Sequence, residues 1–211
     1  MDGLDYERQL LAAGYAAVAG VDEVGRGPLA GPVVCAAVIL SAREEDRIFG
    51  INDSKKLSAK KRETLAQIIR EKARAWSIAE VDAGTIDEIN ILQATRLCMK
   101  RAVEGLSVIP DMVLTDGNMT LDIAYPQRSI VKGDALVCSI GAASILAKVY
   151  RDELMRRYAE QFPQYGFERN AGYGTAEHIR AIGEYGLCSI HRRTFALKFS
   201  AEGAKTPSAA I

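Results

Sequence analysis

The stretch VAGVDEVGRGPLAGPVVCAAVIL, from Val18 to Leu40, decides how this chain folds. Two apolar runs, 18–21 and 32–40, have the length and the Val, Ala and Ile content of buried strands. Between them lies DEVGRGPLAG, in which two adjacent carboxylates precede an arginine between glycines and a turn rich in Pro and Gly. The stretch therefore predicts two strands joined by a turn, with charged residues where the first strand ends.

Asp22 and Glu23 end a strand that is otherwise suited to burial. An isolated buried carboxylate is costly, so such groups usually pair, accept hydrogen bonds or bind a metal ion. Gly25 and Gly27 let the backbone approach a ligand closely, and Arg26 between them is a cation suited to phosphate. Metal-binding carboxylates beside such a turn indicate phosphodiester chemistry, whereas the alternative is a plain hairpin whose acidic end faces water.

Six segments together carry a resemblance to a known family. They are DEVGRGPLAGPVV (22–34), DSKKLSAKKRE (53–63), TDGN (115–118), KGDALVCSIGAASILAKVYRD (132–152), GYGT (172–175) and HRRTF (191–195). In content and order they resemble bacterial ribonuclease HII, of the type 2 ribonuclease H family, over roughly residues 15 to 197. One short motif matches by chance, whereas six in order are specific.

The pattern of strands and helices fits an α/β domain. Strands are expected at 17–23, 31–41, 75–81, 112–115 and 129–132. Helices are expected over 1–14, from Ser58, from Thr85 to about Gly105, from Gly133 to about Tyr158 and from Thr175 to about Tyr185. The first three strands should be antiparallel and the last two parallel to the first. The resemblance implies a ribonuclease H-like fold, with a five-stranded mixed sheet flanked by helices, a small C-terminal helical extension and the fourth strand beside the first.

Three parts of the chain are expected. They are a catalytic domain over 1–160, a helical region contributing to substrate recognition over 161–198 and a disordered tail over 199–211.

Composition is that of an ordinary globular protein, with 48% hydrophobic and 26% charged residues. The formal net charge is zero, so no overall basicity indicates nucleic acid, although the distribution of charge matters more than its sum. The four cysteines form no CxxC pair, and the N-terminus has no signal sequence. No apolar run approaches the length of a membrane span. We expect a cytoplasmic protein with free buried thiols and no membrane partner.

The resemblance implies a catalytic, metal-binding set of Asp22, Glu23, Asp116 and Asp134. Mutual repulsion within such a cluster is relieved by hard divalent cations, so the expected cofactor is Mg²⁺ or Mn²⁺, with two ions when substrate is bound. Two ions can activate a water and stabilise the leaving oxygen of a phosphoryl displacement. Without the resemblance, Asp116 would fit a simple turn and Asp134 a carboxylate balancing a helix dipole.

Recognition of RNA requires a detector of the 2′-hydroxyl. The resemblance assigns this role to the backbone of the GRG turn, Gly25, Arg26 and Gly27. It also places Tyr173 on the sugar that follows the ribonucleotide. Taken alone, Tyr173 would be a loop tyrosine packed on the domain.

Several basic residues have two readings. Lys55 and Lys56 are either phosphate contacts or solvated lysines that precede a helix. His191, Arg192 and Arg193 are either a basic surface or a clamp on the core, and the sequence does not choose between these readings.

The resemblance implies an endoribonuclease that hydrolyses the RNA strand of RNA–DNA hybrids. It also implies nicking 5′ of single ribonucleotides embedded in duplex DNA, with 5′-phosphate and 3′-hydroxyl ends, in DNA replication and ribonucleotide excision repair. These duplexes are the expected partners, and we expect a monomer. The alternative is a non-catalytic hybrid-binding module, but all four family carboxylates are present. A ribonuclease HIII-like nuclease is the enzymatic alternative; those proteins resemble a chain with an extra N-terminal domain, for which this length leaves no room.

Overall fold

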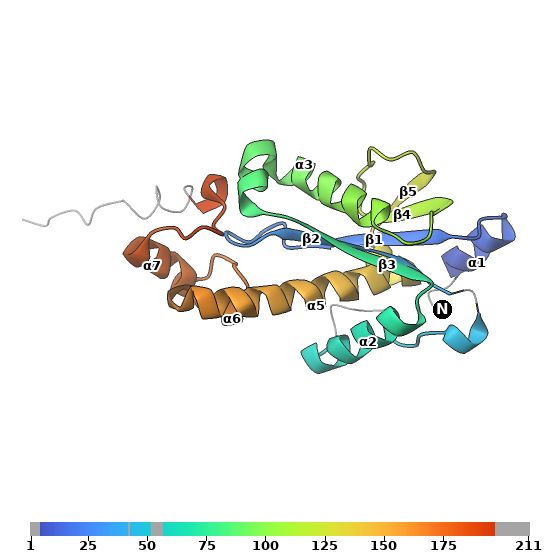
Figure 1. The fold of residues 1–211 in the computed structure, drawn as a ribbon, viewed down its shortest axis with the longest axis horizontal. Helices are drawn as coiled ribbons and strands as arrows, with labels where there is room; N and C mark the ends of the chain where they lie inside the picture. The colour runs from blue at the N-terminus through green and yellow to red at the C-terminus, as the bar shows by residue number, and fades with distance from the viewer. Residues whose placement is uncertain (1–4, 42, 52–56, 197–211) are drawn as a thin grey trace, which may run out of the picture.

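The computed structural model describes residues 5–41, 43–51 and 57–196. A five-stranded sheet forms the centre of the fold (Figure 1). Its strands are β1 (Val18–Val24), β2 (Val33–Ile39), β3 (Ala75–Val81), β4 (Met112–Asp116) and β5 (Gln127–Ile130). The longer helices are α1 (Asp5–Ala12), α2 (Ala59–Lys72), α3 (Ala83–Glu104), α5 (Cys138–Gln161) and α7 (Ala176–Tyr185). Short helices are η1 (Glu44–Asp46), α4 (Gly133–Leu136), η3 (Pro163–Tyr165) and α6 (Phe167–Asn170).

The sheet has the strand order β3-β2-β1-β4-β5. Neighbouring strands are antiparallel from β1 to β3, while β4 is parallel to β1 and β5 is parallel to β4. The expected mixed sheet, with β4 beside β1, is therefore confirmed. This order brings the C-terminal ends of β1 and β4 to the same edge.

Two hydrophobic cores lie on opposite faces of the sheet. All seven residues of β2 are buried, and its alternate side chains enter different cores. Val33 and Cys35 belong to the core beneath α3, whereas Val34 and Ala36 belong to the core shared with α5 and α2 (Figure 1). Each fully buried Val or Ile side chain contributes about 1.5–3 kcal/mol relative to exposure, so the continuous apolar run of β2 specifies a central strand.

Helix α5 packs directly on β1 at Gly20. A Cβ atom at this glycine would lie 2.2 Å from the backbone nitrogen of Ile140, so any side chain would push the helix away from the strand. The small residues of SIGAASILA (139–147) permit this close approach. The contact fixes which residues of α5 lie over the C-terminal end of β1.

The expected single helix from Gly133 is wrong, because the chain forms α4, breaks at Val137 and then forms α5. Val137 has extended backbone angles (φ −126°, ψ 120°), and its side chain is buried against Leu114 and Ile140. Burial of this side chain explains the break. The last strand is also shifted: β5 spans 127–130 instead of 129–132.

Helix α3 begins after Asp82 and not at Thr85. The Asp82 side chain accepts hydrogen bonds from the backbone N–H and the hydroxyl of Thr85, so Asp82 is the N-cap. Asn90 interrupts the helix with φ 65° and ψ 163°, and its side-chain oxygen accepts the N–H of Leu92. Helix α2 begins directly after Ser58, as expected, and the Ser58 side chain accepts the N–H of Lys61 as its N-cap.

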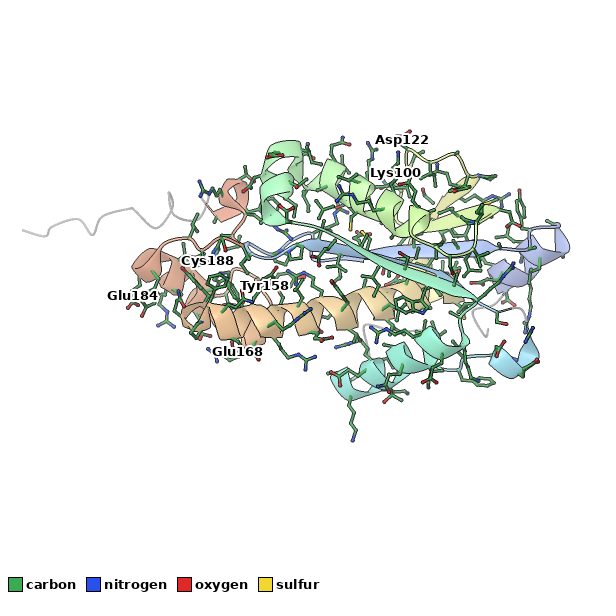
Figure 2. The ribbon with its side chains drawn as sticks, in the orientation of Figure 1. Lys100, Asp122, Tyr158, Glu168, Glu184 and Cys188 are labelled. Atoms are coloured by element: carbon green, nitrogen blue, oxygen red, sulfur yellow. The ribbon has the colours of Figure 1, made fainter. Side chains whose placement is uncertain are left out.

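The C-terminal helices pack on the end of α5 around the buried rings of Tyr165 and Phe167. Figure 2 shows Tyr158 of α5 and Cys188 close to this cluster, while Lys100 of α3 and Asp122 lie across the sheet from α5. The four cysteines are free thiols, three of them buried, as expected. Within the described residues, no helix is long and apolar enough to span a bilayer.

Candidate active site

Three of the four predicted carboxylates line one cavity at the edge of the sheet. The residues lining it come from β1, β4, α2, α5 and the segment before α7. They are Asp22, Glu23, Val24, Arg62, Asp116, Ser144, Lys148 and Tyr173.

Asp22 and Asp116 lie at the C-terminal ends of β1 and β4. These strands are parallel neighbours with Val21 opposite Thr115, so the two aspartates follow paired positions. Because Val21 enters the core beneath α3, Asp22 points to the opposite face of the sheet, toward α5. There the buried Asp22 carboxylate accepts a hydrogen bond from the Ser144 hydroxyl.

Glu23 reaches the same cavity from the other face of β1. Its backbone N–H donates to Asp22 Oδ1 at 2.8 Å, and its Oε1 lies 3.4 Å from Nη1 of Arg26. The Arg26 side chain is 44% exposed, so this ion pair is screened and contributes at most about 1 kcal/mol. Arg26 can therefore exchange Glu23 for a phosphate at little cost.

Asp134 is buried in the first turn of α4. The N–H of the preceding residue, Gly133, donates to Asp116 Oδ1 at 2.7 Å and ties α4 to the end of β4. Lys132, between β5 and α4, has a left-handed backbone, φ 59°. Asp134 does not itself line the cavity, but it follows directly the residue that is hydrogen-bonded to Asp116.

Electrostatics at these carboxylates favour a cation. Burial raises the pKa of Asp22 well above its usual value, and the charges of Glu23 and Asp116 raise this pKa further, against hydrogen bonds from Ser144 and Glu23 that lower it. Burial also raises the pKa of Glu23, partly offset by Arg26. A hard divalent ion would stabilise the ionised forms of these carboxylates, and their oxygens are the ligands that such an ion prefers. Among the described residues no three possible ligands already stand close enough to hold one, so the metal centre stays a prediction.

The sequence reasoning missed three polar residues of the cavity. Ser144 and Lys148 are one helical turn apart on α5, and Arg62 comes from α2. Lys148 pairs with Asp152 at 2.6 Å, which holds its ammonium at the cavity. The available signal was two polar residues spaced i, i+4 within an otherwise apolar half of a helix. Lys55 and Lys56 lie outside the described residues.

Tyr173 lines this cavity, and the GRG turn lies beside Tyr173. Gly25 has φ +90°, and a Cβ atom there would lie 2.2 Å from Arg151 Nε, so only glycine fits. A Cβ atom at Gly27 would be 3.6 Å from Cε1 of Tyr173, which places the tyrosine ring beside the turn. Tyr173 is 47% exposed, so its ring is not a core side chain.

The structure decides the reading of the HRR triplet. His191 and Arg192 are buried and clamp the core, whereas the Arg193 side chain is exposed. The backbone N–H of Arg193 donates to Asp87 of α3 at 2.7 Å.

Comparisons with known proteins identify the family of the chain. A family model described as Ribonuclease HII matches residues 19–198. The chain is 55% identical over 191 residues to a ribonuclease HII of Enterococcus faecalis, covering 90% of this chain and 74% of that protein. It is 58% identical over 177 residues to ribonuclease HII 1 of Methylibium petroleiphilum, covering 84% and 88%.

A solved structure shares the fold. The ribonuclease H2 of Pyrococcus horikoshii superposes with a TM-score of 0.75 at 27% identity, covering 90% of this chain and all of that one. The mixed sheet order, the carboxylates at the ends of β1 and β4 and the match along most of the sequence lead to one conclusion. The chain belongs to the ribonuclease HII family and has its ribonuclease H-like fold.

Proposed function

We propose that this enzyme nicks duplex DNA 5′ of single embedded ribonucleotides and leaves 5′-phosphate and 3′-hydroxyl ends. This activity adds to the metal-dependent ribonuclease H activity on RNA–DNA hybrids that comes with family membership. One observation carries the proposal: Asp22, Glu23, Asp116 and Tyr173 line one cavity, with the GRG turn against Tyr173. The carboxylates suited to phosphodiester chemistry and the residues suited to recognising a sugar would thus contact the same nucleic-acid strand.

Asp22, Glu23, Asp116 and Asp134 would hold Mg²⁺ or Mn²⁺, two ions with substrate bound. When bound, such ions supply a nucleophilic water and charge stabilisation of the leaving oxygen. The oxygen-only donors and the raised pKa values of Asp22 and Glu23 support this assignment, because a cation would stabilise their ionised forms.

Three further residues have roles that this cavity supports. The Ser144 hydroxyl fixes the orientation of the Asp22 carboxylate by donating to it. Lys148 on α5 and Arg62 on the neighbouring helix α2 place two cations at the cavity. These cations are suited to phosphates of the bound strand. Lys148 is held by Asp152, and the Arg62 guanidinium donates to the carbonyl of Leu57 at 2.8 Å, so both charges are kept at the cavity.

The sugar is read by the GRG turn and Tyr173. Backbone groups of Gly25, Arg26 and Gly27 contact the 2′-hydroxyl, and the exposed Tyr173 ring packs on the deoxyribose that follows. A 2′-hydroxyl on that second sugar would clash with the ring or lose hydration. This arrangement supports cutting at the junction between a ribonucleotide and DNA.

The remaining expectations are part of this proposal. Residues 1–160 form the catalytic domain and 161–198 contribute to substrate recognition, since Tyr173 and the clamp residue Arg192 both come from the second segment. We propose that the enzyme acts as a monomer in the cytoplasm, in DNA replication and ribonucleotide excision repair. The buried free thiols support a reducing compartment.

The direct test is a labelled duplex that contains one ribonucleotide, incubated with Mg²⁺, Mn²⁺ or a chelator. We expect one cut, 5′ of the ribonucleotide, with either ion and none with the chelator. An all-DNA duplex of the same sequence is the control. Binding without cutting, under every metal condition, would favour the alternative of a hybrid-binding module.

A further inference from the structure

Arg192 is a fully buried arginine whose guanidinium donates to three backbone carbonyls. Nη2 donates to the carbonyl of Gly25 at 2.5 Å, Nη1 to that of Arg26 at 2.9 Å and Nε to that of Gly31 at 2.9 Å. Two of these acceptors belong to the GRG turn. The side chain thus joins residues that are 167 positions apart in the sequence.

The cost of this arrangement points to a role beyond packing. In the described part of the chain, Arg192 forms no ion pair, and burial lowers the pKa of its guanidinium. The charge of Asp87 and the ring of Phe195, 5.3 Å from the guanidinium carbon, also stabilise this cation, but its direct hydrogen-bond acceptors are carbonyl groups. Such a buried charge carries a desolvation penalty, and an apolar side chain of similar volume is often as good for stability. The benefit therefore lies in what the three hydrogen bonds fix.

The hydrogen bonds set the direction of the peptide groups in the turn. In a trans peptide the C=O of one residue and the N–H of the next point in opposite directions. Because Arg192 draws the carbonyls of Gly25 and Arg26 inward, the N–H groups of Arg26 and Gly27 point away from it. Both of these residues are exposed, and neither N–H donates to another described residue.

The segment that carries Arg192 is itself fixed to the far side of the turn. The backbone N–H of Arg192 donates to the carbonyl of Leu29 at 2.8 Å, and the N–H of Gly31 donates to the carbonyl of Ile190 at 2.9 Å. Between these bonds, Ala30 pairs with His191 as an isolated antiparallel bridge. The guanidinium therefore enters from a rigid position and can hold the turn.

We propose that Arg192 is the positioning residue of the ribose-reading turn: it keeps two N–H donors, those of Arg26 and Gly27, aimed at the ligand before substrate arrives. The inference rests on the proposed reading of the 2′-hydroxyl by the GRG turn. A guanidinium is required because three nitrogen atoms in one plane reach three carbonyls, whereas the single nitrogen of a lysine does not.

The test compares two constants for one enzyme preparation with Mg²⁺. One is KM for a duplex with a single ribonucleotide, and the other is the inhibition constant Ki of the all-DNA duplex of the same sequence. Their ratio measures ribose recognition, while Ki alone measures binding to the phosphate backbone. The variants are Arg192→Gln and Arg192→Lys. The control is Met99→Ala, which removes a fully buried side chain of α3 from the core beneath that helix, without a hydrogen bond to the turn.

We expect both Arg192 variants to raise KM by on the order of tenfold or more, toward Ki, because a displaced donor pair loses its alignment. Ki and kcat should stay within about threefold, since Arg192 touches neither the carboxylates nor the cationic side chains of the cavity. Met99→Ala should leave KM/Ki unchanged although it lowers the melting temperature. If Arg192→Gln does not fold, Arg192→Lys, which keeps the charge and most of the length, carries the test.

Two results are separable. If wild-type KM equals Ki, the enzyme does not sense the ribose in binding, and the proposed reading by the turn fails. If wild type discriminates but either folded Arg192 variant keeps the wild-type KM/Ki, Arg192 is only a structural residue and this inference is overturned. A change in KM/Ki that also occurs in Met99→Ala overturns it as well.

Discussion

Asp22 is buried between the sheet and α5, in a position where the fold gains nothing from a charge. Because its pKa is raised, the ionisation of Asp22 makes the metal-free fold less stable. A carboxyl whose folded-state pKa exceeds the unfolded value of 3.8 destabilises the metal-free fold as the pH rises above that value. The residue is therefore kept for what it binds.

Replacing Asp22 by Asn should abolish cleavage and stabilise the metal-free protein. The loss of rate should be on the order of 10³-fold or more, because several kcal/mol of transition-state stabilisation disappear. The free energy of unfolding, measured with denaturant in chelator at pH 8, should increase, because the buried charge is gone while the amide oxygen still accepts the N–H of Glu23. This gain should vanish near pH 4.

Asp122→Asn is the matched control for this experiment. The Asp122 side chain is 99% exposed and pairs with Lys100 across the sheet from α5 (Figure 2). Its replacement should change neither cleavage nor the pH dependence of unfolding. Near-normal turnover by Asp22→Asn would remove Asp22 from the site.

At the scale of elements, α2 and α5 bring cations to a chain whose net charge is zero. Arg62 and Lys148 line the cavity from these two helices, whereas Lys100, whose side chain is 33% exposed, lies on α3, across the sheet. We therefore expect the local placement of these cations, and not the overall charge, to attract a duplex.

Arg62→Ala should weaken binding of duplexes and flatten its salt dependence. Each phosphate contact contributes about 0.9 to the slope of log K against log salt, so the slope should fall by about one. Fluorescence anisotropy with a chelator present measures this without cleavage. Lys100→Ala is the control and should keep the wild-type slope. An unchanged slope in Arg62→Ala would mean that Arg62 contacts no phosphate of the duplex.

Two buried histidines link Cys188 to the backbone of Tyr173 through a chain of hydrogen bonds. The N–H of Cys188 donates to Nδ1 of His191 at 2.9 Å, so His191 must donate from Nε2 to Nε2 of His178, 3.0 Å away. His178 then donates from Nδ1 to the carbonyl of Tyr173 at 2.9 Å. Both rings are neutral in this arrangement, and a second proton on either would break it.

The two histidines should make the fold less stable in acid. Burial lowers the pKa of both rings, and that of His191 to about 4. For a base with a lowered folded-state pKa, stability is complete above the unfolded value of 6.5 and falls as the pH drops toward about 4. Denaturant unfolding at pH 7.5 and pH 5.0 should show a smaller loss in His191→Gln than in wild type. Equal losses would mean that the pKa of His191 in the folded protein is not lowered below its unfolded value.

At the scale of the whole molecule, local patterns predict the sheet but not the breaks in the helices. The short apolar run 18–21 of β1 and the seven apolar residues of β2 are sufficient to identify buried strands, because runs of this kind fit strands that are covered on both faces. The break at Val137 depends on the burial of its side chain against β4, and the N-cap at Asp82 competes with an equally good signal at Thr85. Such choices are made by tertiary contacts.

The site divides in the same way. Asp22 and Glu23 are visible in the sequence because they end an apolar strand, whereas Asp116 and Asp134 need the family resemblance to distinguish them from turn and helix-end residues. The role of Arg192 could not be predicted, because its acceptors are backbone carbonyls more than 160 residues away. Backbone acceptors leave no signal in residue types.

The central claim is that one cavity combines a carboxylate centre with a separate reader of the sugar. The most direct measurement is the ratio of cleavage rates on a single-ribonucleotide duplex and on a uniform RNA–DNA hybrid, for wild type and Tyr173→Ala. An aromatic contact of this kind contributes about 1–3 kcal/mol, so the variant should lose roughly 5- to 150-fold on the single ribonucleotide relative to the hybrid, with the fold and metal binding intact. The same ratio in variant and wild type would contradict the account.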